Sequence, residues 1–394
     1  RAQIFCYGLT ALANAFLHSR RRFFAAAWSP ILPNIIIIAS LLSLPDPAGD
    51  EWTLADVLSN GRVRWTLAAG ATAGIATMAL VLIPAVRRAG LQWRPNLQWR
   101  HPAVRRLVAM SGWTLGYVIA NQIVVLVVRN LARPGSGDAT AYFDAYTFFV
   151  LPHGLLAMSI ATTFSPELAR AMARRDTGAF TAQASLGVRL IALMTIPAGV
   201  VLFVLRRPLI GLFLQRGNYT VEDVLNTSRA LGGFALGLAG FSVYLFVLRG
   251  FYADQDTRTP FLINVFQCFL NVVLAVVLVD RYGVLGLGAA FALSYLIGAL
   301  VALWVLRARI PGFPLEVILG NVARMALAGV LSAEAMWVVA RAVGDNAGTA
   351  ALARLVVAGT VGVVVYGGVL YALGAPELES IRARLAGRRR ARLR

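Results

Sequence analysis

The sequence predicts an all-α membrane protein that crosses the bilayer many times, and three observations carry this prediction. The chain has 394 residues, of which 58% are hydrophobic and 14% are charged, and its mean hydropathy is +0.70. Its apolar runs recur at about 20 residues, the length that an α-helix needs to span a bilayer. Apolar and polar residues do not alternate in these runs as they would in half-buried strands.

Eleven apolar segments are predicted to be membrane-spanning helices. In chain order they are 2–17, 27–44, 64–86, 106–129, 140–163, 185–205, 229–249, 259–279, 284–306, 320–342 and 351–373. The loops between them alternate between two sides of the membrane, and one side holds 21 arginines against 6 on the other. Because cytoplasmic loops keep the basic residues, the loop after the first segment and the C-terminus are expected to be cytoplasmic.

The positive charge of the chain does not indicate nucleic-acid binding. The net charge is +19, and all 37 basic residues are arginines. They lie at the ends of apolar runs rather than on one soluble face, so no nucleic-acid partner is expected. The basic tail 381–394 is expected to lie on anionic lipids of the cytoplasmic leaflet.

Enzymatic and metal chemistry find little support in the sequence. It contains no nucleophile–base pair, phosphate-binding loop or metal-ligand cluster, so we expect neither an enzyme nor a cofactor. Cys6 and Cys268 lie in apolar runs without a CxxC spacing and are expected to be packing residues. His18, His101 and His153 are isolated from one another and do not form a ligand set.

A short charged segment, GFYADQDTR at 250–258, separates two strongly apolar runs. Pro260 follows it in the first turn of the next helix, where its missing N–H would have no partner in any case. Thr257 or Thr259 is expected to cap that helix. Arg249, with the charged residues of the segment, is expected to hold the turn at the level of the lipid headgroups.

This turn has a weak counterpart near the start of the chain. Residues 14–32 align with 249–267, so that Phe16 matches Phe251 at an offset of 235 residues and six predicted spans. An even number of spans places both turns on the same side of the membrane. The alignment therefore predicts two parallel repeats about an axis along the membrane normal.

The repeat predicts the domain organisation. Four helices precede the second turn and only one precedes the first, so three further helices are expected upstream of residue 1, giving fourteen in all. The expected domains are 1–105, the remainder of an N-terminal lobe; 106–319, a six-helix C-terminal lobe; 320–374, two appended helices; and 375–394, the tail. With three helices of one lobe absent, residues 1–394 alone are not expected to transport.

Four motifs stand out in the chain, at 7–35, 151–170 (LPHGLLAMSIATTFSPELAR), 212–224 (LFLQRGNYTVEDV) and 250–260. Together they resemble the lipid II flippases, the MurJ/MviN family of the multidrug/oligosaccharidyl-lipid/polysaccharide exporter superfamily. The resemblance implies a two-lobe exporter fold with about eleven of fourteen helices present. It also implies alternating-access transport of lipid II, the undecaprenyl-pyrophosphate-linked peptidoglycan precursor, across the cytoplasmic membrane.

A two-lobe protein could solve the physical problem of moving such a polar headgroup through a bilayer. Burying a pyrophosphate and a glycopeptide in hydrocarbon is very costly, and a wet cationic cavity between the lobes would remove that cost. The family places the lipid tail beside its last two helices. Open alternatives are a flippase for another polyprenyl-linked glycan, a drug/sodium antiporter, or an inactive scaffold that binds cell-wall synthesis proteins.

Polar residues within predicted spans are the candidate binding residues. Asn264, Gln267 and Asn271 lie at i, i+3 and i+7, on one face of a helix. They either line a central cavity or make interhelical hydrogen bonds, and the sequence leaves both open. Gln122 is a further cavity candidate. Asn271 also matches one position of the sodium site of some family members.

The charged candidates are Arg129 and Asp144. Many family members have an arginine at the position of Thr147, so Thr147 marks a missing headgroup-binding cation. Arg129 either replaces that cation or forms an ion pair with Asp144. For the sodium site, Val128 and Ala275 stand where other members have polar ligands, which argues against sodium here.

Glu334 lies near the middle of a predicted span, where an ionised carboxylate is costly. It either pairs with Arg354, stays neutral or faces a groove.

Overall fold

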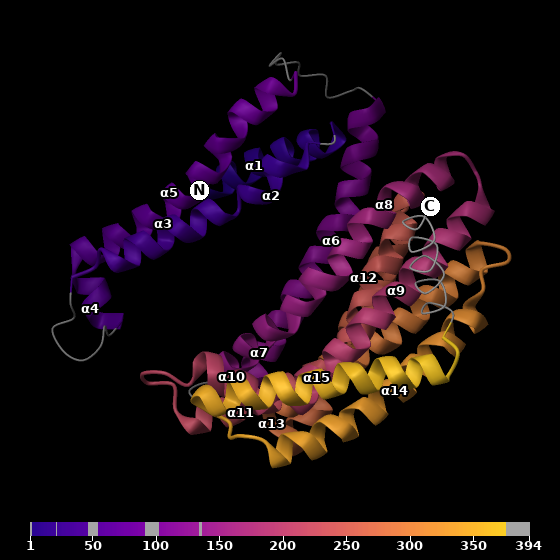
Figure 1. Cartoon of the computed structure of the whole chain (residues 1–394). Coiled ribbons are helices and arrows are strands. Elements are labelled where there is room, and N and C mark those ends of the chain that lie inside the picture. Colours follow the sequence, from indigo (N-terminus) through magenta and orange to yellow (C-terminus); the bar gives the residue numbers. More distant parts are fainter. Residues whose placement is uncertain (1, 21, 46–53, 91–101, 134–135, 376–394) are drawn as a thin grey trace, which may run out of the picture. The chain divides into compact units, whose positions relative to one another are not determined.

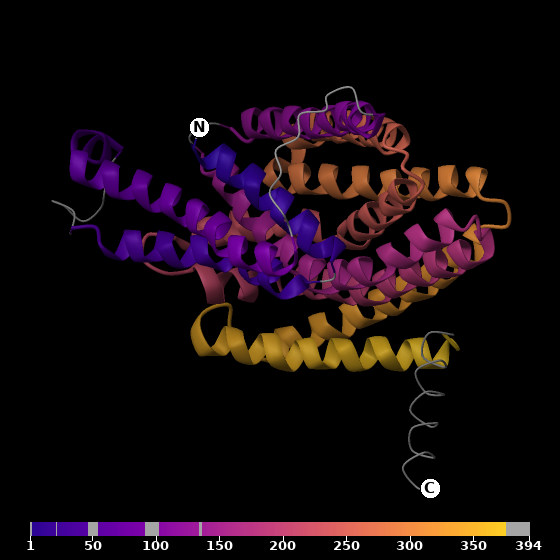
Figure 2. The same cartoon turned by 90° about the horizontal axis from the view of Figure 1, so that it is seen from above.

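A computed structural model describes residues 2–20, 22–45, 54–90, 102–133 and 136–375, and the regular elements in these ranges are all helices (Figures 1 and 2). The tail 381–394 lies outside the described residues. The chain divides into two compact units, residues 1–98 and 99–394. The predicted domain boundaries stay a prediction.

The first unit packs its helices against one long central helix. Its elements are α1 (Ala2–Ser19), α2 (Phe23–Trp28), α3 (Ile31–Leu42), α4 (Leu54–Ser59) and α5 (Gly61–Arg88). Asn60 caps α5, since its side chain accepts hydrogen bonds from the backbone N–H groups of Arg62 and Val63. Both α1 and α3 pack along α5. Leu17 of α1 and Leu82 of α5 are fully buried in one cluster with Ala26 of α2.

The second unit holds the larger core. Its elements are α6 (Pro102–Leu131), α7 (Asp138–Pro152), the π-helix η1 (His153–Ala157), α8 (Met158–Ala173), α9 (Thr177–Val204), α10 (Arg206–Leu214), α11 (Val221–Ala235), α12 (Leu238–Ala253), α13 (Arg258–Arg309), α14 (Leu315–Ala342) and α15 (Gly348–Ala372). Phe149, Phe234, Phe241 and Phe291 form its aromatic centre, with ring centroids 5.1–5.7 Å apart. Offset and edge contacts of this kind stabilise a core beyond its buried area.

The helix α13 is two antiparallel arms joined at one residue. Gly283 has φ 56° and ψ −137°, a conformation that breaks the helix and that suits glycine. Gln267 of the first arm donates a 3.0 Å hydrogen bond to Ser294 of the second, and a Cβ on Gly286 would meet the Leu278 carbonyl. These pairings place the arms side by side in opposite directions.

The prediction of an all-α polytopic membrane protein is confirmed. In the described part of the chain, eight helices are long and apolar enough to cross a membrane, or nine if the bent pair α11 and α12 is one span. The predicted count of eleven differs for two reasons. The 52-residue α13 contains two of the predicted segments, and the 18-residue α1 does not meet this test.

The charged turn before α13 is held by Asp256. Its Oδ1 accepts hydrogen bonds from the backbone N–H groups of Arg258 (2.9 Å) and Thr259 (3.0 Å). Its Oδ2 forms an ion pair with Arg309, at the far end of the second arm. The prediction that Thr257 or Thr259 caps the helix was wrong, because a carboxylate two residues before the helix satisfies its free N–H groups. Asp256 therefore fastens both ends of the α13 pair.

The prediction that Arg249 lies at headgroup level stays a prediction, but its side chain does not bond to the turn. Arg249 is half-buried and turns toward α8, where it donates to Ser165 Oγ (3.2 Å) and Met158 Sδ (3.1 Å).

We expect Asp256→Ala to lower stability by about 1–3 kcal/mol, since it removes a cap and an ion pair together. Burial tends to raise the pKa of Asp256, but the hydrogen bonds from Thr259 and Arg309 outweigh it and leave this pKa below its usual value. The carboxylate thus stabilises the fold above its unfolded pKa, and this stabilisation is lost as pH falls through the lowered value. Thermal unfolding in detergent from pH 7 to pH 3 measures this. A Tm difference between wild type and variant that is unchanged at pH 3 would contradict it.

Candidate functional site

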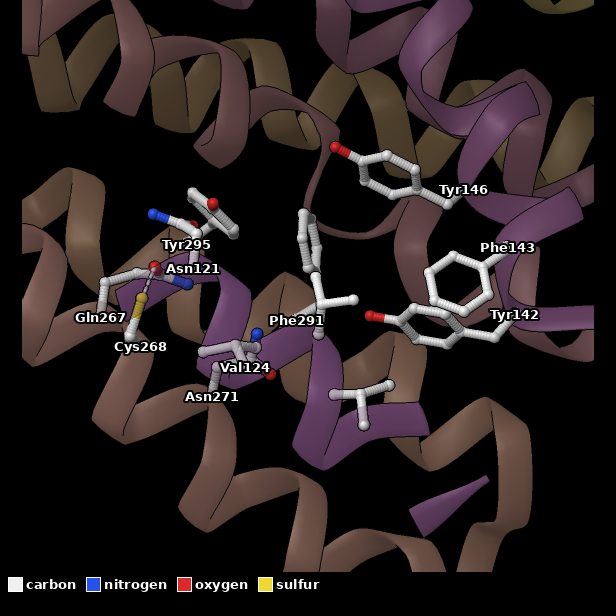
Figure 3. A pocket seen from close by; sticks show the side chains of 12 residues that line it. Asn121, Val124, Tyr142, Phe143, Tyr146, Gln267, Cys268, Asn271, Phe291 and Tyr295 are labelled. Atoms are coloured by element: carbon white, nitrogen blue, oxygen red, sulfur yellow. Dashed lines mark hydrogen bonds between the residues drawn. The ribbon is translucent and has the colours of Figure 1, made fainter. Parts of the chain in front are cut away.

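A cavity of about 200 Å³ lies inside the second unit, between α6, α7 and the two arms of α13 (Figure 3). Asn121, Gln267 and Asn271 line one side of it in this view, and Tyr142 and Tyr146 line the opposite side. Asn121, Gln267 and Asn271 lie well inside α6 and the first arm of α13, far from the ends of these helices. The cavity is therefore a polar site within otherwise apolar spans.

Hydrogen bonds connect several of the polar side chains at and beside this cavity. Asn121 Nδ2 donates to Asn264 Oδ1 at 3.1 Å, which joins α6 to the first arm of α13. Gln267 Nε2 donates to Ser294 Oγ at 3.0 Å, and Ser294 in turn donates to the Phe291 carbonyl at 2.8 Å. Pairs of this kind between membrane helices contribute about 0.6–2 kcal/mol each.

In the described part of the chain, two amides near the cavity each keep one unpartnered atom, Asn264 its Nδ2 and Asn271 its Oδ1, and of these two residues only Asn271 lines the cavity. Its side chain is buried and lines the cavity, yet its Oδ1 has no hydrogen-bond partner among the described residues. An unpartnered buried carbonyl costs about 1–3 kcal/mol. Oδ1 itself has almost no accessible surface, so a molecule in the cavity would reach it only after the Asn271 side chain turns.

The described lining of the cavity carries no charged side chain. Amides, phenols and the thiol of Cys268 supply donors and acceptors but no net charge. Such a site suits water, hydroxyls or amides, and it does not by itself neutralise a pyrophosphate.

The structure separates the predicted site residues into two groups. Gln267 and Asn271 line the cavity, and Asn264 supports it through the bond to Asn121. Gln122, Arg129 and Thr147 are exposed and do not line it. Whether any of them binds a substrate stays a prediction.

The predicted ion pair between Arg129 and Asp144 is not formed. The half-buried Asp144 instead accepts a hydrogen bond of 3.2 Å from Tyr219 Oη, which also bonds Thr227 at 2.5 Å. Burial, opposed by the Thr227 bond and reinforced by the Asp144 carboxylate, raises the pKa of Tyr219 to about 12, so this phenol stays neutral and donates. Sequence reasoning missed Tyr219 because it lies 75 residues away in a loop.

We expect Tyr219→Phe and Asp144→Asn to be coupled in a double-mutant cycle by about 1 kcal/mol, the usual contribution of such a bond. Arg129→Ala is the matched control and should change stability by less than about 0.5 kcal/mol. Thermal unfolding of the purified variants gives these values. Coupling between Arg129→Ala and Asp144→Asn instead would restore the ion-pair interpretation.

The structure also bears on the predictions for Glu334 and for the sodium-site positions Val128 and Ala275. Arg354 does not pair with Glu334, because its guanidinium donates to Val343 O (2.8 Å), Gly344 O and Asn346 Oδ1 (2.7 Å). Glu334 is exposed on α14. Val128 and Ala275 are buried apolar side chains.

His153 was predicted only to form no ligand set with the other histidines, and the structure gives it a serine partner. Its Nδ1 lies 3.0 Å from Ser242 Oγ in the core, at the π-helix that follows Pro152. No local pattern in the sequence indicates a contact across 89 residues.

Comparison with known proteins shows a family. The family described as lipid II flippase MurJ matches residues 2–357. A probable lipid II flippase MurJ of Rhizobium meliloti (strain 1021) is 30% identical over 301 residues, which are 75% of this chain and 54% of the relative. That of Vibrio cholerae is 28% identical over 287 residues, 72% of this chain and 52% of the relative. The chain thus spans about half the length of the curated relatives it matches.

A solved structure has the same fold. It is the lipid II flippase MurJ in an inward closed conformation, with a TM-score of 0.69, 22% identity, and coverage of 95% of this chain and 73% of that one. Since the family match extends over most of its length, the chain belongs to the MurJ lipid II flippase family, whose members are multi-pass membrane transporters rather than enzymes.

Proposed function

We propose that this chain takes part in moving lipid II across the cytoplasmic membrane by alternating access, with its C-terminus in the cytoplasm. The observation that carries the proposal is the family match over residues 2–357, reinforced by relatives that bear the flippase name. The arginine distribution supports the orientation.

The cavity of the second unit suits part of this task. Its amides and phenols offer hydrogen bonds to sugar hydroxyls and peptide amides at a depth where lipid tails offer none. The pyrophosphate needs cations, and the described cavity lining has none. We therefore assign charge neutralisation to groups outside this cavity, with the exposed Arg129 as a candidate.

The lipid tail has different requirements. It needs an apolar surface that is continuous with the bilayer, and we propose the outer faces of α14 and α15 for it. Leu327, Val338, Val356 and Val363 are exposed apolar side chains on these two helices.

The test is complementation of cells depleted of their own flippase with the full-length gene that contains the coding sequence of this chain. We expect growth to be restored and lipid II to become sensitive to a lipid II hydrolase added outside the cells. Rescue of a different polyprenyl-linked glycan pathway would favour that alternative. A chain that neither flips nor rescues, but still binds cell-wall synthesis proteins, would favour the scaffold.

The role of Arg129 is tested in the same cells. Arg129→Ala is expected to lower rescue at normal expression, and Thr147→Arg is expected to restore it in part by placing a cation where other family members have one. Arg105→Ala, which removes an exposed arginine near the other end of α6, is the control. Full activity of Arg129→Ala would remove Arg129 from the site.

A further inference from the structure

A second cavity, of about 560 Å³, lies in the same unit where α9 passes into α10 and α14 passes into α15. Four arginines line it, Arg206, Arg207, Arg341 and Arg354, together with Trp337 and Phe203. No aspartate or glutamate is among its described lining residues. We call it the arginine pocket. It is separate from the polar cavity between α6, α7 and α13.

The walls of the arginine pocket are held in place without a ligand. Three donors of Arg354 fix the loop between α14 and α15 by bonding Val343, Gly344 and Asn346. The Asn346 carbonyl in turn lies so close to Gly211 of α10 that a Cβ there would meet it at 2.1 Å. Both ends of the loop are thereby fastened, so a ligand would meet a preformed surface.

The remaining arginines are positioned but not neutralised. The guanidinium of Arg341 lies 3.5 Å from the ring centroid of Trp337, and that of Arg206 lies 4.9 Å from that of Phe203. Arg207 is exposed. None of the four arginines forms an ion pair with a described residue. Guanidinium groups gathered without a carboxylate repel one another, and a phosphate relieves this by accepting paired hydrogen bonds.

The apolar side chains around the arginine pocket favour a phosphate that belongs to a lipid over free phosphate. Trp337 and Phe203 are exposed at the pocket, and Val338 continues the apolar surface along α14. Aromatic side chains of this kind lie at the headgroup level of a bilayer. A phosphate that carries acyl chains would use both the arginines and this apolar surface, whereas free phosphate would use only the arginines.

We propose that the arginine pocket binds the phosphate of an anionic phospholipid headgroup, independently of transport. The predicted topology places it at the membrane face opposite to the turn before α13, the face with few arginines in its loops. There it would hold a lipid against α9, α10, α14 and α15 and couple these helices to the anionic lipid content of that leaflet.

The test follows thermal unfolding of the purified chain in neutral detergent with added phosphatidylglycerol, phosphatidylcholine or inorganic phosphate. Phosphatidylglycerol is expected to raise Tm by binding the folded state. Arg207→Gln with Arg341→Gln should increase the phosphatidylglycerol concentration needed for half of this rise by about tenfold or more. The matched control, Arg216→Gln with Arg229→Gln, removes the same charge from exposed positions outside the pocket and should keep the wild-type response.

Three results would overturn the proposal. Equal protection by phosphatidylcholine would leave no role for charge, and equal protection by inorganic phosphate would make this a site for free anions. Loss of the phosphatidylglycerol response in the control double variant would show that the effect depends on the net charge of the protein and not on the arginine pocket. If the double variant does not fold, Arg207→Gln alone serves, together with quenching by brominated phosphatidylglycerol of the Trp337 fluorescence, defined by difference from Trp337→Phe. Absence of that quenching in the wild type would also overturn the proposal.

Discussion

Gly233→Leu is expected to abolish the folded protein, with a loss of more than about 4 kcal/mol, the range of exceptional single substitutions. A Cβ at Gly233 would lie 2.6 Å from both the Ala289 nitrogen and the Leu285 oxygen of the second arm of α13. From the other side, a Cβ at Gly288 would lie 2.5 Å from the Ala230 oxygen. The two helices thus touch backbone to backbone, and no change of rotamer relieves a side chain placed there.

The consequence extends into the core beside this crossing. Phe234 and Phe291 lie next to it, with ring centroids 5.1 Å apart, and separating the helices would open that contact. The measurement is the yield of monodisperse protein after purification, together with its Tm. Gly368→Ala, at a helical glycine with open space around it, is the control and should be neutral or slightly stabilising. A Gly233→Leu protein as stable as this control would show that the crossing adapts freely.

Asn271→Leu is expected to lower transport by at least about tenfold while leaving stability unchanged or higher. The substitution removes an unpartnered buried carbonyl, so it breaks no hydrogen bond of Oδ1 and relieves a cost of about 1–3 kcal/mol. It also replaces a polar group of the cavity by an apolar one, which weakens any hydrogen bond to a passing headgroup.

Asn264→Leu is the matched comparison on the same helix face. It breaks the bond to Asn121 and should cost about 0.6–2 kcal/mol of stability. The pair of variants separates a structural role from a transport role through complementation and Tm measured together. Full transport by Asn271→Leu would mean that the cavity is a packing defect rather than a part of the passage.

The sequence was sufficient for the architecture because membrane spans are long and uniform. A bilayer demands about 20 apolar residues in each helix, and that signal survives without knowledge of any tertiary contact. Each of the eleven predicted segments falls mostly on helices of the structure, although 27–44 also covers the turn between α2 and α3 and 229–249 covers the bend between α11 and α12. The one-residue break at Gly283 was placed correctly between two segments because Asp280 and Arg281 interrupt the apolar run.

The candidate site was less accessible from the sequence. The helical face of Asn264, Gln267 and Asn271 was recognised from spacing alone, but the spacing does not reveal which amide is bonded. Asn264 Oδ1 and Gln267 Nε2 find partners 143 and 27 residues away, whereas Asn264 Nδ2 and Asn271 Oδ1 find none among the described residues. The predicted ion pair of Arg129 with Asp144 was wrong for a similar reason. The Asp144 carboxylate accepts a hydrogen bond from Tyr219, a loop residue that the sequence does not place beside it.

The antiparallel arms of α13 also bear on how the chain enters the membrane during synthesis. If the first arm entered alone, Asn264, Gln267 and Asn271 would face lipid without the second arm, and Gln267 would lack Ser294. With a single residue between the arms there is no loop to be translocated separately. Both arms are therefore expected to leave the insertion machinery together, as one hairpin whose amides are already covered when lipid first surrounds them.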